Sequence, residues 1–220
     1  MLRDKKPYRI LVIEDNPGDI IIVEDFLMEQ INDPVIEQAG NFKQAREILS
    51  VKDYLFDVIL LDLSLPDKSG EKLVTDMLQI APLCPIIILT GFADINFSIK
   101  SISLGIIDYL LKDDLNATTL YKSIIYAIER KKTILQLERA EKKASDLFHL
   151  SPQPMWLYDT ETFRFVEVNK AAIDKYGYSE EEFLNIITKD LDANNDILAN
   201  EVTGGLQKPE TDEIYKGIFT

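Results

Sequence analysis

The sequence predicts an α/β fold: a doubly wound sheet of five parallel strands, followed by a long helix and a smaller second part. Three nearly continuous apolar runs indicate the sheet, because strands that helices cover on both faces look like this: 9–13, 57–63 and 85–90. Stretches with helical spacing separate these runs and two shorter strand candidates, 34–39 and 106–111. Strand and helix therefore alternate five times.

Apolar residues at helical spacing mark three of the intervening helices. The markers are Ile22, Phe26 and Leu27 in the first helix, Ala45, Ile48 and Leu49 in the second, and Leu73, Met77 and Ile80 in the third. Asn41 followed by Gln44 has the pattern of an N-cap and N3 pair, which predicts where the second helix begins.

A long helix is predicted from about residue 118 to the Ser151-Pro152 pair, because no Pro or Gly interrupts a charged helical pattern there. Its first part is expected to pack on the sheet through Ile124, Ile125 and Ile128. Further on, four residues recur at intervals of three, four and three: Leu137, Ala140, Ala144 and Leu147. This short heptad stripe is compatible with a single solvated connector helix or with a parallel dimer helix that carries a signal onward.

The last part of the chain loses the parallel-strand pattern. Segments 154–159 and 163–169 read as two strands joined by a turn, and 213–220 begins another strand. Ser179 and Glu182 form a capping box at a helix start. We therefore expect domains at residues 1–130 and 151–220, joined by a connector helix over 131–150.

Composition excludes several classes of protein. A net charge of −14 argues against a bare nucleic-acid binder, which needs an excess of Lys and Arg. Cys84 is the only cysteine, so no disulfide can form within the chain and a reducing compartment fits. The first apolar run is too short for a signal peptide, and no run reaches the length of a membrane span. We expect a cytoplasmic protein with no nucleic-acid or membrane partner.

Polar residues gather at one edge of the predicted sheet. The strong strands end in Glu14 and Asp15, Asp62, Thr90 and Lys112. Singly, each has an ordinary explanation, since Asp15 or Asn16 can cap the next helix and a lone Thr or Lys can pack or be solvated. Because the carboxyl ends of parallel strands meet at the edge where such sheets bind ligands, the five together indicate a functional site.

Three carboxylates in one crevice repel each other and favour a hard cation between them. Mg²⁺ or Mn²⁺ takes oxygen ligands, and Mg²⁺ keeps several waters, so two carboxylates and one backbone carbonyl suffice. We expect Asp15 and Asp62 to be direct ligands and Glu14 to act through a water.

Such a site suits phosphoryl transfer to a carboxylate, where catalysis is mainly positioning and charge neutralisation. Asp62, on the middle strand, is the expected acceptor. Lys112 supplies a compact positive charge that can pair with Asp62 or with a bound phosphoryl group. Thr90 offers a hydroxyl donor, and Gly91 lets a backbone N–H come close to an anion.

These residues carry a resemblance to a known family. The acidic pair Glu14–Asp15, Asp62 followed by LSLPDKSG, Thr90-Gly91, and Tyr109 three residues before Lys112 stand in the order found in receiver domains. Residues 8–130 thus resemble the receiver domain of two-component response regulators. The resemblance implies a CheY-like, flavodoxin-like (βα)5 fold, with Asp62 accepting a phosphoryl group from a histidine kinase or phosphotransfer protein.

The resemblance also implies roles for single residues. Mg²⁺ would be held by Asp15, Asp62 and the backbone carbonyl of Ser64, with the backbone of Ser64 and Gly91 at the phosphoryl group. Thr90 and Tyr109 would be the switch pair, although Tyr109 is also compatible with ordinary packing of a strand aromatic. One departure is Asp113, which stands where the family usually has Pro after the strand-five lysine. Because a cis bond is costly before a non-proline residue, the loop after Lys112 and the fifth helix are expected to differ.

The last part resembles the beginning of a PAS domain, on SPQPMWLYD, FVEVNKAA with Asn169, and YGYSEEEFL. We expect a partial α+β PAS domain at residues 151–220. No haem or flavin is expected, because the only His, His149, precedes the first strand and the flavin-bonding Cys is absent. Trp156 and Phe165 are expected in the core rather than at a ligand.

The leading hypothesis is a phosphorylation-switched receiver that passes its signal through a helix to a PAS module, with a possible homodimer through the connector helix. Alternatives are the N-terminal fragment of a larger hybrid sensor histidine kinase and a pseudo-receiver scaffold. A haloacid-dehalogenase-type hydrolase is disfavoured, because its nucleophile lies on the first strand. The chain is not expected to be a stand-alone enzyme, since His149 has no acidic neighbour in sequence and no nucleotide-binding Gly-rich segment follows.

Overall fold

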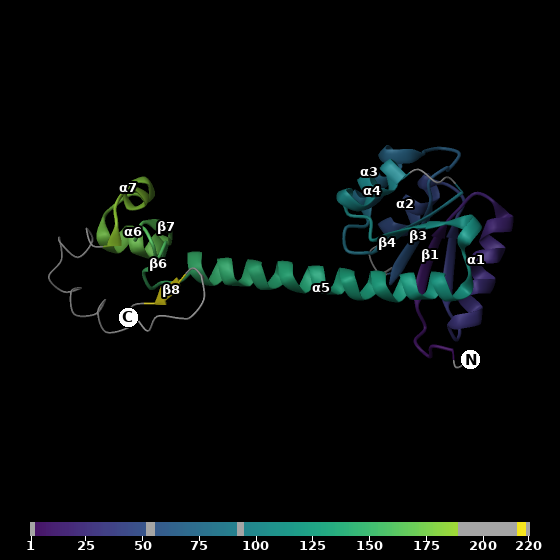
Figure 1. Cartoon of the computed structure of the whole chain (residues 1–220), viewed down its shortest axis with the longest axis horizontal. Coiled ribbons are helices and arrows are strands. Elements are labelled where there is room, and N and C mark those ends of the chain that lie inside the picture. The colour runs from purple at the N-terminus through teal and green to yellow at the C-terminus, as the bar shows by residue number, and fades with distance from the viewer. Residues whose placement is uncertain (1–2, 52–55, 92–94, 189–214, 219–220) are drawn as a thin grey trace. The chain divides into compact units, whose positions relative to one another are not determined.

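The computed structural model describes residues 3–51, 56–91, 95–188 and 215–218. The chain divides into two compact units, Met1–Leu137 and Glu138–Thr220, each of which is described by itself (Figure 1). The domain boundaries expected at residues 130 and 150 stay predictions.

The first unit contains a parallel sheet of five strands in the order β2-β1-β3-β4-β5. The strands are β1 (Arg9–Ile13), β2 (Val35–Ala39), β3 (Val58–Asp62), β4 (Ile86–Thr90) and β5 (Asp108–Leu111). Each of the five apolar segments singled out in the sequence forms one strand. The order reverses direction at β1, so β1 and β3 lie side by side at the switch point where such sheets bind ligands. The predicted doubly wound α/β fold is confirmed.

Helices alternate with these strands. They are α1 (Pro17–Gln30), α2 (Phe42–Ser50), α3 (Gly70–Ile80), α4 (Ile95–Leu104), the 3-10 turn η1 (Lys112–Asp114) and α5 (Ala117–His149). Asn16 caps α1, its side chain accepting a hydrogen bond from the amide of Gly18. Asn41 caps α2 and accepts from the amide of Gln44, as the sequence pattern predicts.

Alternation along the strands produces two separate cores. Ile10 and Val12 of β1 face α1 and α5, in a cluster that includes Val23 and Leu27. Their neighbours along β1 point to the other face and pack with α2 and α3, in a cluster that includes Met77. Both faces of the sheet are therefore covered, which explains why its strands read as continuous apolar runs rather than alternating ones.

The chain after β5 turns through η1 and enters α5. The described residues contain no cis peptide bond, and Asp113 lies inside η1. α5 packs on the sheet through the buried side chains of Leu120, Ile124 and Ala127, with Ile125 and Ile128 partly buried beside them. The predicted packing is confirmed, and the fifth helix still packs on the sheet when Asp113 replaces proline.

The Asp4 carboxylate ties the N-terminal segment to α5. The Asp4 carboxylate accepts hydrogen bonds from the hydroxyls of Tyr8 (2.7 Å) and Tyr121 on α5 (2.8 Å). The amide of Lys6, together with these two hydroxyls, holds the pKa of Asp4 below its ordinary value of 3.8. Cys84 packs beside the core on the other face of the sheet, the one covered by α2 and α3. Burial raises the pKa of its thiol to about 12.

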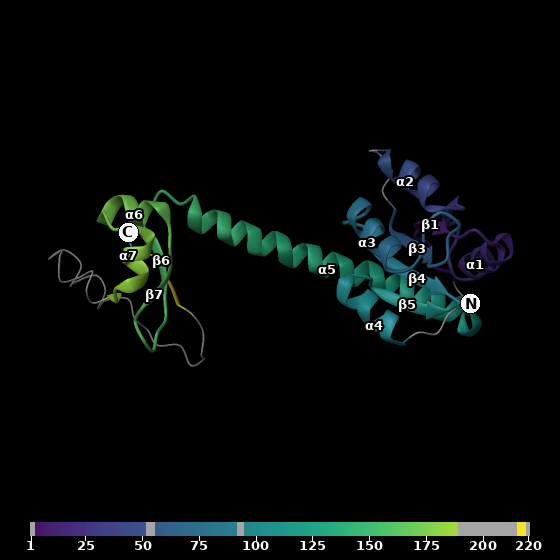
Figure 2. The same ribbon diagram turned by 90° about the horizontal axis from the view of Figure 1, so that it is seen from above.

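The second unit begins in the last turns of α5. Its strands are β6 (Met155–Tyr158), β7 (Phe165–Val168) and β8 (Tyr215–Ile218), antiparallel in the order β7-β6-β8. The helices α6 (Lys170–Tyr176) and α7 (Glu180–Asn185) lie together on one side of β6 and β7 (Figure 2). The predicted strands are present, and Ser179 and Glu182 form the predicted capping box of α7.

An aromatic cluster fills the second unit between sheet and helices. Trp156 and Phe165 are buried and meet edge to face at 6.1 Å between ring centroids, and Phe183 of α7 packs on Phe165 at 5.4 Å. Trp156 and Phe165 therefore belong to the core, as expected.

Asn169 fixes the last turn of α5 to this sheet. Its side chain is fully buried and makes four hydrogen bonds. The Oδ1 atom accepts from the amides of Met155 and Ala172, both at 2.9 Å, and caps α6. The Nδ2 atom donates to the carbonyls of Phe148 at 3.0 Å and Gln153 at 2.8 Å. Because an amide side chain has two donors and two acceptor sites, every position is used.

Among the helices described, none has a stretch long and apolar enough to cross a lipid bilayer.

Candidate functional site

Three carboxylates meet at the carboxyl edge of the sheet. Glu14 and Asp15 follow β1, and Asp62 is the last residue of the adjacent strand β3. One oxygen of each lies within 4.8 Å of the other two, although Glu14 is only 3% exposed and Asp62 only 6%. Asp15 is exposed. The cluster has the hard oxygen donors and the crowded negative charge that suit a divalent cation.

Lys112 is the cation of this site. It follows β5, and its Nζ lies 2.7 Å from Oε2 of Glu14 and 3.3 Å from Oδ1 of Asp62. A third carboxylate, that of Asp19 on the first turn of α1, lies 2.8 Å away. Burial disfavours the charged lysine, but the three carboxylates outweigh it and raise its pKa above the ordinary value. The ammonium is therefore charged at neutral pH.

The buried Glu14 carboxylate is less well compensated. Burial raises its pKa, and the negative charge of Asp62 adds to the effect, while the hydrogen bond from Lys112 opposes both. The amide of Asn16 also donates to Glu14, at 3.1 Å. Two buried carboxylates with one shared ammonium leave an excess of negative charge, which a metal ion would relieve.

The loop after Asp62 is closed at its base. The amide of Gly70 donates to the carbonyl of Leu63 at 3.1 Å, and Ser64 pairs with Ser69 in a short antiparallel bridge. Gly70 has φ = 62°, a left-handed conformation that glycine adopts without strain. The amide of Ser64 donates to Oδ2 of Asp62 at 3.1 Å, so the loop also orients this carboxylate.

Asp67 fastens the outer part of this loop to α2. Its two carboxylate oxygens accept hydrogen bonds from the amides of Phe42 and Lys43, each at 2.9 Å, at the N-terminus of that helix. Burial raises the pKa of Asp67, but these amides outweigh it and hold the pKa below 3.8. The next residue, Lys68, pairs with Asp76 of α3 and lies over the Phe42 ring at 3.8 Å. The loop is thus held to the helices on both sides.

Three predicted site residues remain: Thr90, Gly91 and Tyr109. Thr90 ends β4 and is 2% exposed. Gly91 follows it at the surface, and a β-carbon there would meet no other atom within 4 Å. Tyr109 on β5 is half-buried and packs against the core on the α2–α3 side of the sheet. The structure therefore groups Glu14, Asp15, Asp62 and Lys112, and it places Thr90 and Gly91 at the same edge of the sheet and Tyr109 on the neighbouring strand. The roles assigned to these residues stay predictions.

Sequence reasoning missed Asp19. It lies in the NPGD stretch, where an acidic residue in the first turn of a helix has an ordinary explanation in the helix dipole. The only signal was its place four residues after Asp15, which puts it in the first turn of α1, beside the sheet edge.

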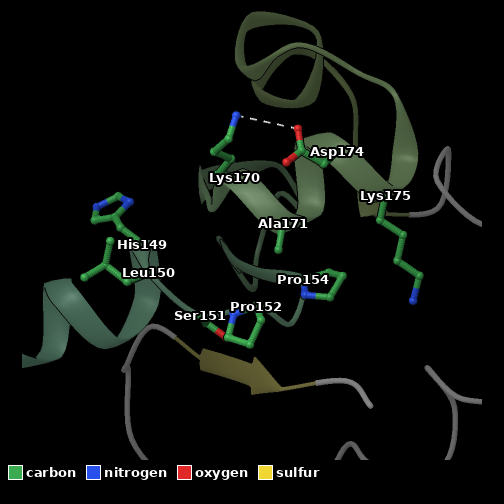
Figure 3. A pocket seen from close by; sticks show the side chains of 9 residues that line it. All are labelled: His149, Leu150, Ser151, Pro152, Pro154, Lys170, Ala171, Asp174 and Lys175. Carbon is green, nitrogen blue, oxygen red and sulfur yellow. Dashed lines mark ion pairs between the residues drawn. The ribbon is translucent and has the colours of Figure 1, made fainter.

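A second candidate region is an open groove of about 620 Å³ in the second unit (Figure 3). It lies between the end of α5, the Ser151–Pro154 segment and α6, whose Lys170 and Asp174 form an ion pair at 3.7 Å. None of its lining residues belongs to the buried aromatic cluster, so the groove lies outside the core of this unit. One lining residue, His149, has no acidic residue directly beside it in sequence. In the structure, however, Oε1 of Glu167 lies 3.1 Å from its Nε2.

Comparisons with known protein families cover both units. Residues 10–124, just over half of the chain, match the model of the response regulator receiver domain, and residues 142–209 match that of a PAS domain. The response regulator protein PilR of Pseudomonas aeruginosa is 32% identical over 104 residues, which are 47% of this chain and 22% of PilR. The cell cycle response regulator CtrA of Brucella ovis is 31% identical over 104 residues, 47% of this chain and 43% of CtrA. The chain thus matches less than half the length of these relatives.

Solved structures give the same fold. The signal receiver domain of a putative LuxO repressor protein from Vibrio parahaemolyticus superposes with a TM-score of 0.51 at 26% identity, covering 62% of this chain and 98% of that one. A CheY-like receiver domain protein from Methanospirillum hungatei covers 58% of this chain and 98% of its own, with a TM-score of 0.50. At 22% identity the second likeness shows the fold alone.

Proposed function

Because the chain belongs to the response regulator receiver family, with a PAS domain after the receiver, we propose that it takes a phosphoryl group on Asp62 in a two-component pathway. The observation that carries the proposal is the cluster of Glu14, Asp15 and Asp62, with Lys112 bonded to two of the three. A histidine kinase or phosphotransfer protein would supply the phosphoryl group.

The donor set fits Mg²⁺. Asp15 and Asp62 would hold the ion together with the carbonyl of Ser64, and Glu14 would act through a water. When bound, the ion would neutralise charge on the phosphoryl oxygens. Mn²⁺, which prefers the same ligands, would serve as well.

The chain's own residues would position the reaction. The hydrogen bond from Ser64 holds one oxygen of Asp62, and the other oxygen, which faces Lys112, attacks phosphorus while the donor's bond to phosphorus breaks. The ammonium of Lys112, the hydroxyl of Thr90 and the backbone amide of Gly91 would bind the transferred oxygens. Thr90 and Tyr109 would then form the switch pair, since they lie on the adjacent strands β4 and β5.

The proposed partner of the phosphorylated chain is a second copy, through α5. The helix carries an exposed stripe in which Leu137 is 60% and Leu147 65% exposed, with Ala140 and Ala144 between them. Light scattering at high concentration, with and without phosphorylation, tests this part. A monomer in both states would contradict the dimer and favour a single solvated connector helix.

The main test is the intact mass of the protein after incubation with Mg²⁺ and a small phosphodonor such as acetyl phosphate. We expect a gain of one phosphoryl mass, absent in Asp62→Asn and absent when a chelator removes the metal. No gain from this donor or from a panel of histidine kinases would reject the proposal and favour a scaffold. The matched control is Asp57→Asn, because Asp57 precedes β3 and binds Lys6 and the amide of Arg9 rather than the site.

A further inference from the structure

Asp19 forms an ion pair with Lys112 of the site but is not one of the three clustered acids that could hold a metal ion. Its Oδ2 atom lies 2.8 Å from Nζ of Lys112, almost as close as the Glu14 oxygen at 2.7 Å and closer than the Asp62 oxygen at 3.3 Å. Within the described part of the chain, the one group of acids spaced for a metal ion is Glu14, Asp15 and Asp62. Asp19 therefore contacts the lysine from the α1 side only.

The ammonium of Lys112 has three N–H donors and meets three carboxylates. Two of these partners, Glu14 and Asp62, would turn to the metal and the phosphoryl group during the proposed reaction. Asp19 would not, because it has no place in the metal cluster. It is the partner that can hold Lys112 throughout.

The environment of this pair also distinguishes it from an ordinary surface ion pair. The side chain of Lys112 is 20% exposed and that of Asp19 is 30% exposed, so the surrounding protein restricts the conformations of both side chains. Exposed pairs gain little, whereas partly buried pairs that share a network fix geometry. Asp19 sits on the rigid first turn of α1, which the Asn16 cap holds in place.

We propose that Asp19 is a positioning residue for Lys112: it holds the ammonium at the edge of the acid cluster, where the ammonium meets an oxygen of the phosphoryl group on Asp62. This inference rests on the proposed function of the site. The alternative is that Asp19 serves only α1, as an acidic residue near a helix N-terminus.

The test measures the rate of phosphorylation by acetyl phosphate at saturating Mg²⁺. Saturating metal matters because both Asp19→Ala and Asp19→Asn remove a charge and weaken metal binding alike. We expect Asp19→Ala to slow the reaction about tenfold, since a catalytic group that is out of place loses much of its effect. Asp19→Asn should recover most of the rate, because its amide oxygen still accepts a hydrogen bond. Asp25→Asn, an exposed carboxylate on the same helix, should match the wild type.

A double-mutant cycle with Lys112→Met separates the two roles. If Asp19 acts through the lysine, Asp19→Ala has no further effect once the lysine is gone. An equal loss in both backgrounds, or a wild-type rate for Asp19→Ala, would overturn the inference while leaving phosphorylation of Asp62 intact. Failure of the proposed function would look different, because the wild type itself would then take up no phosphoryl group.

Discussion

Replacing Asn169 by alanine should strongly destabilise the second unit. The change removes four hydrogen bonds of 2.8–3.0 Å from a fully buried position. The amide of Ala172 keeps a backbone bond to residue 169, but the amide of Met155 and the carbonyls of Phe148 and Gln153 lose partners. At about 1 kcal/mol for each group left unpaired, the free energy of unfolding should fall by about 3 kcal/mol.

Urea unfolding followed by tryptophan fluorescence measures this effect, because Trp156 is the only tryptophan and lies in the core of the second unit. With a slope of about 1 kcal/mol per molar urea, the midpoint should move down by about 3 M. Asn185→Ala is the matched control. It removes one exposed hydrogen bond to the carbonyl of Glu181 and should cost less than about 0.5 kcal/mol.

Asn169→Asp separates the contribution of the two donated hydrogen bonds from that of the two accepted ones. The carboxylate keeps the shape and both acceptor roles, but it faces the carbonyls of Phe148 and Gln153 with no hydrogen to donate. We expect a loss at least as large as for alanine at neutral pH, with partial recovery on acidification, when the acid can donate again. A midpoint within about 0.5 M of the wild type for both variants would refute the reasoning, since it would mean that the four bonds contribute no net stability.

Three further predictions concern the first unit. Asp67→Ala should slow phosphorylation of Asp62 severalfold and lower the melting temperature by a few degrees, because it frees the loop from α2; unchanged rates would show that the loop needs no such support. Cys84 should react with a thiol reagent at neutral pH only as fast as the first unit opens, since its pKa is about 12; rapid labelling of the folded protein would contradict this. Asp4→Asn should weaken the acceptor of Tyr8 and Tyr121 and lower stability by about 1 kcal/mol at pH 7. Because the pKa of Asp4 is depressed, this contribution is present above pH 3.8 and is lost as the pH falls through the folded-state value, so variant and wild type should converge in acid; a constant difference would argue against it.

The sequence predicts most of the site because neighbouring residues alone mark where each strand ends. An apolar run that stops at Asp62 or Thr90 places that residue at the carboxyl edge of a parallel sheet, whichever order the strands take. The order of the strands then needs no separate prediction, because all five ends share one edge. The burial of Trp156 follows in the same way from its place on a short aromatic strand.

The contacts that sequence reasoning missed join residues far apart in the chain. Asp67 meets the start of α2 only because the loops after β1, β2 and β3 gather at one edge of the sheet, and nothing beside Asp67 in sequence marks its partner. His149 finds Glu167 only after the β6–β7 pair folds against the end of α5. Asn169 caps α6, but it also binds the carbonyls of Phe148 and Gln153, and nothing beside Asn169 in sequence marks these two partners.

The most direct test of the central claim is to locate the phosphoryl group. Borohydride reduces an aspartyl phosphate to homoserine, so reduction of the phosphorylated chain followed by peptide fragmentation identifies the residue that carried it. We predict homoserine at position 62, formed only in samples that contained Mg²⁺ or Mn²⁺, with Glu14 and Asp15 unmodified. Label at another carboxylate, or an acid-labile phosphoryl group on His149 with none on Asp62, would contradict the account.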